Sequence, residues 1–144
     1  MFRVYGTPAP QGSKSAFVRG GRAVLVEQSK KVKPWRAAVR DAAAQAGLTP
    51  TMEPVSARIT FVLPRPKTHF GSKAGQPYLK PSAPVFVATT PDLDKLLRST
   101  LDGLTESGVI GDDRQVVVLH SQKRYAQPGE APGAIVHLED VTAP

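Results

Sequence analysis

Residues 91–118 read PDLDKLLRSTLDGLTESGVIGDDRQVVV and hold the clearest pattern in this chain of 144 residues. Leucines recur at three- and four-residue spacing from Leu93 to Leu104, which predicts an amphipathic helix that ends at Gly108. Branched apolar residues follow, so we expect a strand over 115–120. Acidic residues stand just before each of these two elements, and the pattern therefore places carboxylates at the start of both.

Two aspartates stand at the start of the predicted helix. Asp92 takes the N-cap position, where a carboxylate accepts hydrogen bonds from free backbone amides, and Asp94 lies in the first turn, where acids favour the helix dipole. Both residues could therefore be simple helix starters. Because an N-cap residue has a non-helical backbone, the two carboxylates can also face one point.

A second acidic pair, Asp112 and Asp113, precedes the predicted strand. Carboxylates from a helix start and a strand start, without Cys or paired His, form an oxygen-rich set that suits Mg²⁺ or Mn²⁺ rather than Zn²⁺. From the residues alone, metal binding and plain capping both stay open. Arg98 lies one turn from both Asp94 and Asp102, so it either joins a salt-bridge ladder or holds a phosphate beside the metal.

The remaining elements are predicted from alternating apolar residues, turn residues and one further helical stripe. They cover residues 2–5, 16–19 paired with 22–27, 29–46, 55–63 and 134–138. Because proline is tolerated only in the first turn of a helix, Pro34 also allows the upstream helix to begin nearer Lys33. The apolar stripe of the upstream helix consists of Trp35, Ala38, Val39, Ala42 and Ala46. The sequence thus predicts an α+β fold, a single domain over residues 1–144 with a mixed β-sheet and two main helices on one face.

The stretch from residue 64 to residue 91 holds six prolines, two glycines, four basic residues and no acid. Because proline cannot donate to a β-ladder, we expect a long basic loop with at most a short extended piece over 85–88. Phe70 and Tyr78 within it either stack on nucleic-acid bases or pin the loop to the body. Long loops in compact domains are usually functional or disordered.

Positive charge is concentrated in the first part of the chain. Lys and Arg number 19 against 12 Asp and Glu, which gives a net charge of +7. Residues 1–90 hold 14 of the basic residues and three acids, whereas residues 91–144 hold five basic residues and nine acids. Excess charge can serve solubility, but basic surface beside concentrated carboxylates also suits a protein that holds phosphate and binds metal.

Composition excludes several classes of protein. The absence of Cys excludes disulfide scaffolds, Cys-containing zinc sites and thiol nucleophiles. No run of 18 apolar residues predicts a membrane span, and no leader precedes Phe2, so we expect a cytoplasmic protein without membrane association. Residues 12–15 lack the spacing of a phosphate-binding loop, and the three histidines lack the spacing of metal ligands.

Three runs in the second half of the chain resemble the RusA family of Holliday junction resolvases, which are small homodimeric endonucleases of bacteria and phages. The runs are Pro-Asp-Leu-Asp-Lys-Leu from Pro91, Thr-Leu-Asp-Gly-Leu from Thr100 and Gly-Val-Ile-Gly-Asp-Asp-Arg-Gln-Val-Val from Gly108. The family signature is Asp-Leu-Asp-Asn-Leu, a helix, and Asp-Asp-x-Gln-Val. Residues 8–14 are also similar to an N-terminal motif of many phage members.

The resemblance implies Mg²⁺-dependent DNA cleavage, with Mn²⁺ as a substitute. By position, Asp92, Asp94 and Asp113 match the family's essential metal-binding carboxylates, and Asp112 matches a neighbouring acid. Arg98 stands where the family often has a functionally important lysine. Two symmetric nicks in a four-way junction suit a homodimer with one site per subunit.

Basic side chains are the natural contacts for DNA phosphates, and they include Lys95, which replaces the usual asparagine of the family motif. The expected DNA-binding residues are Lys14, Arg19, Lys30, Lys31, Lys67, Lys73, Lys80 and Lys95. We therefore expect an endonuclease that resolves Holliday junctions and other branched DNA in recombination and repair. One alternative is a non-catalytic DNA- or RNA-binding module in which the aspartates serve only as helix caps and turn residues. Another is an Asp-x-Asp metal enzyme of nucleotide sugars, for which 144 residues leave little room.

Overall fold

The computed structural model describes residues 1–12, 14–19, 22–27 and 30–141. Strands and two helices alternate along the chain, which confirms the predicted α+β class. In chain order the elements are β1 (Phe2–Tyr5), β2 (Lys14–Arg19), β3 (Arg22–Glu27), α1 (Val32–Gln45), β4 (Val55–Leu63), η1 (Lys67–His69), β5 (Phe70–Lys73), β6 (Gln76–Leu79), α2 (Leu93–Ser107), η2 (Asp113–Gln115), β7 (Val116–Tyr125) and β8 (Gly133–Asp140), where η marks a short 3-10 turn.

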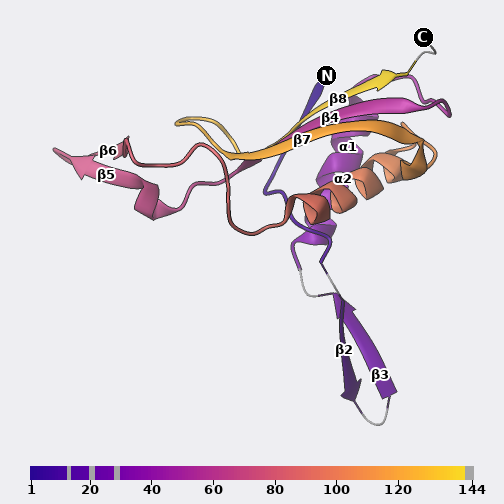
Figure 1. Cartoon of the computed structure of the whole chain (residues 1–144), viewed down its shortest axis with the longest axis horizontal. Coiled ribbons are helices and arrows are strands. Elements are labelled where there is room, and N and C mark those ends of the chain that lie inside the picture. The colour runs from indigo at the N-terminus through magenta and orange to yellow at the C-terminus, as the bar shows by residue number, and fades with distance from the viewer. Residues whose placement is uncertain (13, 20–21, 28–29, 142–144) are drawn as a thin grey trace.

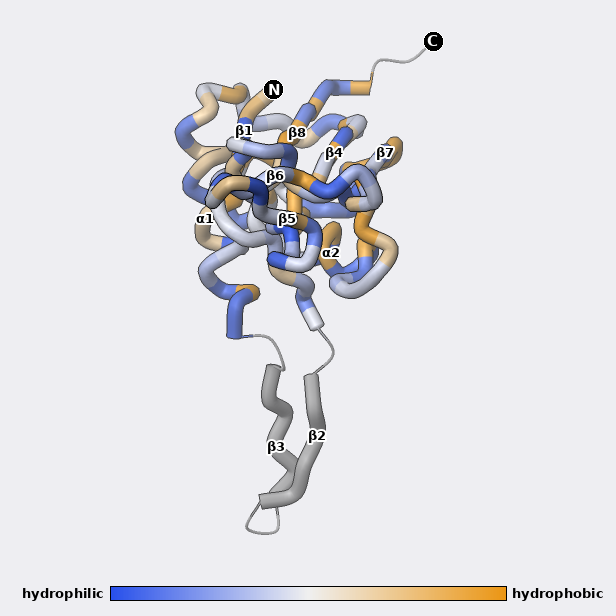
Figure 2. The backbone as a smooth tube through the Cα atoms, turned by 90° about the vertical axis from the view of Figure 1, so that its left-hand side faces the viewer, coloured by the Kyte–Doolittle hydropathy of each residue, from blue (hydrophilic) through white to orange (hydrophobic). Residues whose placement is uncertain are grey.

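A mixed four-stranded sheet forms the centre of the molecule, with strand order β1-β8-β4-β7 from left to right in Figure 2. β4 pairs antiparallel with β8 and parallel with β7. The alternating residues of β4, from Val55 to Leu63, are all buried, as predicted. β7 extends to Tyr125, five residues beyond the predicted end at His120, because its polar second half stays paired with β4 up to Leu63.

Both helices cover one face of this sheet, as predicted (Figure 1). They approach each other closely at Gly103 of α2, where an added Cβ would lie 2.8 Å from the Cβ of Val39 on α1. A buried hydrogen bond from Trp35 Nε1 to Thr100 Oγ1, 3.1 Å long, also joins them. No helix of the described residues is long and apolar enough to cross a membrane.

The limits of α1 differ from the prediction. The helix begins at Val32, which agrees with the start near Lys33 that Pro34 allows, while the other predicted start, Ser29, lies outside the described residues. It ends at Gln45, before Gly47 takes a positive φ of +73°. Ala43 is therefore buried in the last turn, whereas the predicted stripe residue Ala46 is exposed.

The prediction of an irregular loop over residues 64–91 was wrong. The segment contains η1 and a β-hairpin of β5 and β6, which projects from the body (Figure 1). The chain reverses at Ala74 and Gly75, which both take positive φ, as a two-residue hairpin turn requires. Pro77 is tolerated because the hairpin has only two strands and both of them are edges.

The base of this hairpin is fixed to the sheet by Arg65. Its Nε donates to Ala126 O at 2.8 Å and its Nη1 to Pro84 O at 2.7 Å, while the guanidinium lies 5.3 Å from the ring centre of Tyr125. The predicted extended piece over 85–88 is confirmed in part, because backbone hydrogen bonds join Val85 and Val87 to the end of β7. The hairpin therefore leaves the body from a rigid base.

A second hairpin, of β2 and β3, was predicted and is confirmed. The two strands pair antiparallel over six residues each. In Figure 1 this hairpin stands away from the body on the side of the helices. The described part of the chain thus carries two projecting hairpins, which point in different directions (Figure 1).

Candidate active site

The start of α2 presents a free carboxylate. Asp92 is the N-cap residue, as predicted, with an extended backbone at φ −69° and ψ 138°. Its side chain makes no capping hydrogen bond, however, and is 56% exposed, with Oδ2 3.7 Å from Lys95 Nζ. Capping therefore does not account for this aspartate, and its carboxylate is available to a ligand.

Asp94 and Arg98 are also exposed, one turn apart on α2. Within the described residues, Arg98 forms no ion pair with Asp94 or Asp102. The salt-bridge ladder that the spacing left open is therefore absent from this part of the chain. The guanidinium of Arg98 and the carboxylate of Asp94 are therefore both available at the surface of the first half of α2.

The helix start is held in place from two sides. From β7, Lys123 Nζ donates to Thr89 O at 2.6 Å and to Pro91 O at 2.8 Å. From the N-terminal segment, the amide of Gln11 donates to Lys95 O at 3.0 Å, and Ala9 O accepts from buried Ser99 at 2.7 Å. The positions of Asp92 and Asp94 are therefore set by the core of the fold and not by a loop alone.

Asp112 has a structural role in the second acidic pair. Its side chain accepts a hydrogen bond from the Arg114 amide at 2.9 Å, and the Gln115 side chain accepts from the Asp112 amide at 2.9 Å, which completes a capping box. Gln115 Nε2 also donates to Thr51 O at 3.0 Å. Capping thus accounts for Asp112, whereas its predicted contact with a metal remains a prediction.

Asp113 is exposed and has a raised pKa. The largest cause is a hydrogen bond that its carboxyl shares with Asp112, followed by partial desolvation and the negative charges of Asp112 and Asp102. The pKa of Asp112 is lowered, first by the hydrogen bond from the Arg114 amide and then by the bond to Asp113. Three carboxyl groups therefore share one negative region, where a cation would lower the free energy.

The aspartates at the helix start, Asp92 and Asp94, and the second acidic pair, Asp112 and Asp113, lie at different ends of α2. Asp102 is two helical turns beyond Asp94, a distance of about 12 Å along the axis. The charge of Asp102 contributes to the raised pKa of Asp113, and η2 follows the end of α2 in the chain, so Asp113 lies near the second half of this helix. Among the described residues, no three Asp, Glu or His side chains come close enough to hold one metal ion.

The predicted DNA-binding residues fall on separate surfaces. Lys30 and Lys31 are exposed at the start of α1, and Lys67, Lys73 and Lys80 are exposed along η1 and the β5–β6 hairpin. Lys95 is half-buried beside Asp92. The side chains of Lys14 and Arg19, on β2, lie outside the described part of the chain.

The chain was compared with known proteins. The family model described as endodeoxyribonuclease RusA matches residues 6–139, nearly the whole chain. The chain belongs to the RusA family. Membership of the RusA family indicates an endodeoxyribonuclease that resolves Holliday junctions, and it leaves an enzyme of nucleotide sugars without support. No curated protein sequence matches the chain.

Two residues that contribute to this RusA-family site were missed by sequence reasoning. Lys123 holds the backbone before Asp92, and Arg65 fixes the base of the β5–β6 hairpin. Both residues donate hydrogen bonds to backbone carbonyls of segments that are distant in the sequence, and no local sequence motif predicts such a hydrogen bond. For Asp112, by contrast, the spacing to Gln115 is that of a capping box, and this signal was present in the sequence.

Proposed function

We propose that this RusA-family protein is a Mg²⁺-dependent endonuclease that resolves four-way DNA junctions by two symmetric nicks, in recombination and repair. The observation that supports this best is the pair of exposed carboxylates, Asp92 and Asp94, on a helix start that is fixed by its neighbours. A non-catalytic binding module would need both acids only as helix starters, and Asp92 makes no capping hydrogen bond.

The donor chemistry fits Mg²⁺ or Mn²⁺, because carboxylate oxygens are the ligands that these ions prefer. When bound, the ion would polarise the phosphoryl oxygens and lower the pKa of a water molecule. We propose Asp92, Asp94 and Asp113 as its ligands, with Asp112 beside them. Since one protomer does not bring three such side chains together in the described residues, we propose that a homodimer completes the set.

The free edge of β7 favours this homodimer. β7 is an edge strand of ten residues, and Val117, Val118 and Leu119 on it are 57%, 39% and 40% exposed. In the described chain, only the segment around Phe86 pairs with that edge, at its far end near Arg124. The first half of this edge is apolar and carries no strand in the described chain; such an edge is a template for another strand, and two copies of it pair with two-fold symmetry.

Antiparallel pairing of two β7 edges would also bring the acidic groups together. The start of α2 is bonded to Lys123 near the end of β7, whereas Asp113 directly precedes the beginning of β7. In an antiparallel pair, the beginning of one β7 lies beside the end of the other. Asp113 of the partner subunit would then approach Asp92 and Asp94, so that each metal site takes its ligands from both subunits.

The chain's own basic residues would hold the DNA around such a site. Arg98 would bind the scissile phosphate, because a guanidinium offers a planar fork of donors to phosphate oxygens. Lys67, Lys73 and Lys80 would follow the backbone further away along the β5–β6 hairpin. Two copies of these surfaces, related by two-fold symmetry, match the paired arms of a four-way junction.

The basic test is nicking of a synthetic four-way junction in the presence of Mg²⁺ or Mn²⁺. We expect Asp94→Asn to abolish nicking while junction affinity without metal stays within about twofold of the wild type. Asp41→Asn is the matched control, because Asp41 is exposed on α1 and pairs only with its neighbour Arg40. Wild-type protein that binds the junction but never nicks it with either ion would support the non-catalytic module instead.

A mixing experiment tests whether the site is shared between subunits. Asp94→Asn and Asp113→Asn variants are each expected to be inactive alone. In their heterodimer, a shared arrangement leaves one site with no mutation, so mixing restores single nicks. If each site belonged to one chain, every site in the heterodimer would carry a mutation and the mixture would stay inactive.

A further inference from the structure

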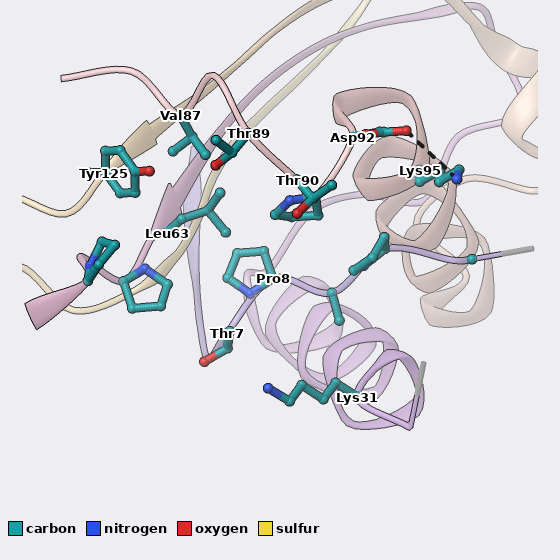
Figure 3. A pocket seen from close by; sticks show the side chains of 16 residues that line it. Thr7, Pro8, Lys31, Leu63, Val87, Thr89, Thr90, Asp92, Lys95 and Tyr125 are labelled. Carbon is teal, nitrogen blue, oxygen red and sulfur yellow. Dashed lines mark ion pairs between the residues drawn. The ribbon is translucent and has the colours of Figure 1, made fainter. Parts of the chain in front are cut away.

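A cavity of about 560 Å³ opens directly beside Asp92 (Figure 3). Six parts of the chain meet around it, namely the N-terminal segment, the start of α1, the end of β4, the segment before α2, the start of α2 and the end of β7. Its volume lies within the range of about 300–1,000 Å³ that is typical of small-ligand sites. The cavity is lined by Asp92 and Lys95 and is therefore continuous with the proposed catalytic site.

The interior of the cavity is mainly apolar. Leu63, Val87 and Tyr125, which pack together and are at most 9% exposed, line it. Proline rings complete the walls, among them Pro8 and Pro64. Proline and tyrosine rings present flat apolar faces, and a planar aromatic ligand buries most surface against such faces.

The rim of the cavity is polar and mainly basic. Lys31 reaches it from α1, and Lys95 stands on the opposite side, paired with Asp92 at 3.7 Å (Figure 3). Thr89 and Thr90, from the segment before α2, also line the cavity. An apolar interior with cationic groups at its mouth suits a ligand with a flat ring and a negative charge, which is the chemistry of a nucleotide.

We propose that this cavity receives one unstacked base of the junction, from the nucleotide next to the scissile phosphate. The proposal rests on the nuclease function proposed above. The base would lie against the floor formed by Leu63, Val87 and Tyr125, and its phosphate would lie between Lys31 and Lys95. Bases at a branch point are the least costly to unstack, because their pairing is already disturbed. The cavity thereby selects branched DNA over a continuous duplex.

The test measures junction affinity without metal, so that it does not depend on nicking. Abasic analogues replace the nucleotides around the branch point one at a time. We expect removal of one particular base to weaken binding by about tenfold, within the range for one stacked base. A 2-aminopurine placed at that position should change its fluorescence when the protein binds. Equal affinity for every abasic junction would overturn the proposal.

A variant pair places the effect in this cavity. Thr89→Trp fills the mouth, whereas Ala88→Trp adds the same side chain at the exposed neighbour that does not line the cavity. We expect the abasic penalty to vanish in Thr89→Trp and to persist in Ala88→Trp. Lys31→Gln, a milder change, should reduce affinity for the intact junction and leave melting temperature unchanged. An abasic penalty of equal size in both Trp variants would overturn the assignment.

The outcomes for the cavity and for the nuclease are separable. Protein that shows the abasic penalty but never nicks supports the cavity and contradicts the nuclease. Protein that nicks the junction without any abasic penalty contradicts the cavity alone. If removing the base weakens binding by Thr89→Trp as much as it weakens binding by the wild type, the base binds elsewhere, for example on the exposed ring of Tyr78. This result would also contradict the proposed role of the cavity.

Discussion

Replacement of Lys123 by methionine tests whether the core of the fold sets the position of Asp92 and Asp94, the proposed catalytic acids. Lys123 Nζ donates to Thr89 O at 2.6 Å and to Pro91 O at 2.8 Å, and so ties the end of β7 to the backbone just before Asp92. Methionine keeps most of the side-chain length but removes both donors. The two carbonyls then lose their partners, and the start of α2 loses its link to β7.

The magnitude follows from these two hydrogen bonds. A hydrogen bond to a charged group contributes about 1.5–3 kcal/mol, but Thr89 is exposed, so water replaces part of the loss. We therefore expect Lys123→Met to lower the free-energy difference that favours the observed position of the helix start over displaced positions by about 2 kcal/mol. At 1.36 kcal/mol per tenfold, the equilibrium constant between the competent and the displaced arrangement falls about 30-fold, and the nicking rate falls by up to this factor.

The assay measures the nicking rate at saturating junction, together with urea unfolding of the same protein. Lys123→Arg should recover part of the rate, because its guanidinium can still donate to a carbonyl. Arg40→Met is the matched control, since it removes one positive charge from an exposed ion pair on α1. A wild-type rate for Lys123→Met at saturating junction would refute the reasoning.

Three further predictions concern stability and DNA binding. Glu130→Gln should lower the free energy of unfolding at pH 7 by about 1–2 kcal/mol, measured by urea unfolding, because Glu130 forms a bidentate pair with Arg124 at 2.6 and 2.9 Å. This pair lowers the pKa of Glu130 from 4.5 to about 2. Its stabilisation is therefore fully present above pH 4.5 and is lost as the pH falls towards 2, so the stabilities of variant and wild type should converge in acid. Gly103→Ala should lower the free energy of unfolding by about 1–3 kcal/mol through the clash with Val39, whereas Gly12→Ala, where nothing lies within 4 Å, should leave it unchanged; equal effects would contradict the close helix contact. Neutralising three lysines together should reduce the salt dependence of junction binding by about three in log–log slope, and an unchanged slope would remove the hairpin from the DNA interface. The three lysines are Lys67, Lys73 and Lys80.

The elements that form the core could be predicted from the sequence. The alternation from Val55 to Leu63 and the leucine spacing from Leu93 to Leu104 report burial directly, because a residue's face follows from its position in the repeat. The mixed sheet with both helices on one face followed from the order of these elements. The β5–β6 hairpin was missed because it buries little, and its Ala-Gly turn lacks the usual Asn-Gly signal.

The candidate site was predictable in its residues but not in its arrangement. The sequence places Asp92 at a helix start, and the structure adds that its carboxylate does not cap the helix. Sequence spacing could not show that the charge of Asp102 acts on Asp113, because that effect depends on where η2 lies relative to α2. The same limit applies to Lys123, whose partners are backbone atoms more than thirty residues away.

The open edge of β7 has a consequence for how such an enzyme would be controlled in the cell. If two copies must meet along that edge before any ion can be held, activity rises with the square of protein concentration while the protein is dilute. A few molecules made by leaky expression would then leave chromosomes uncut. A higher concentration of the protein would then be enough to form the active dimer when many branched intermediates need processing.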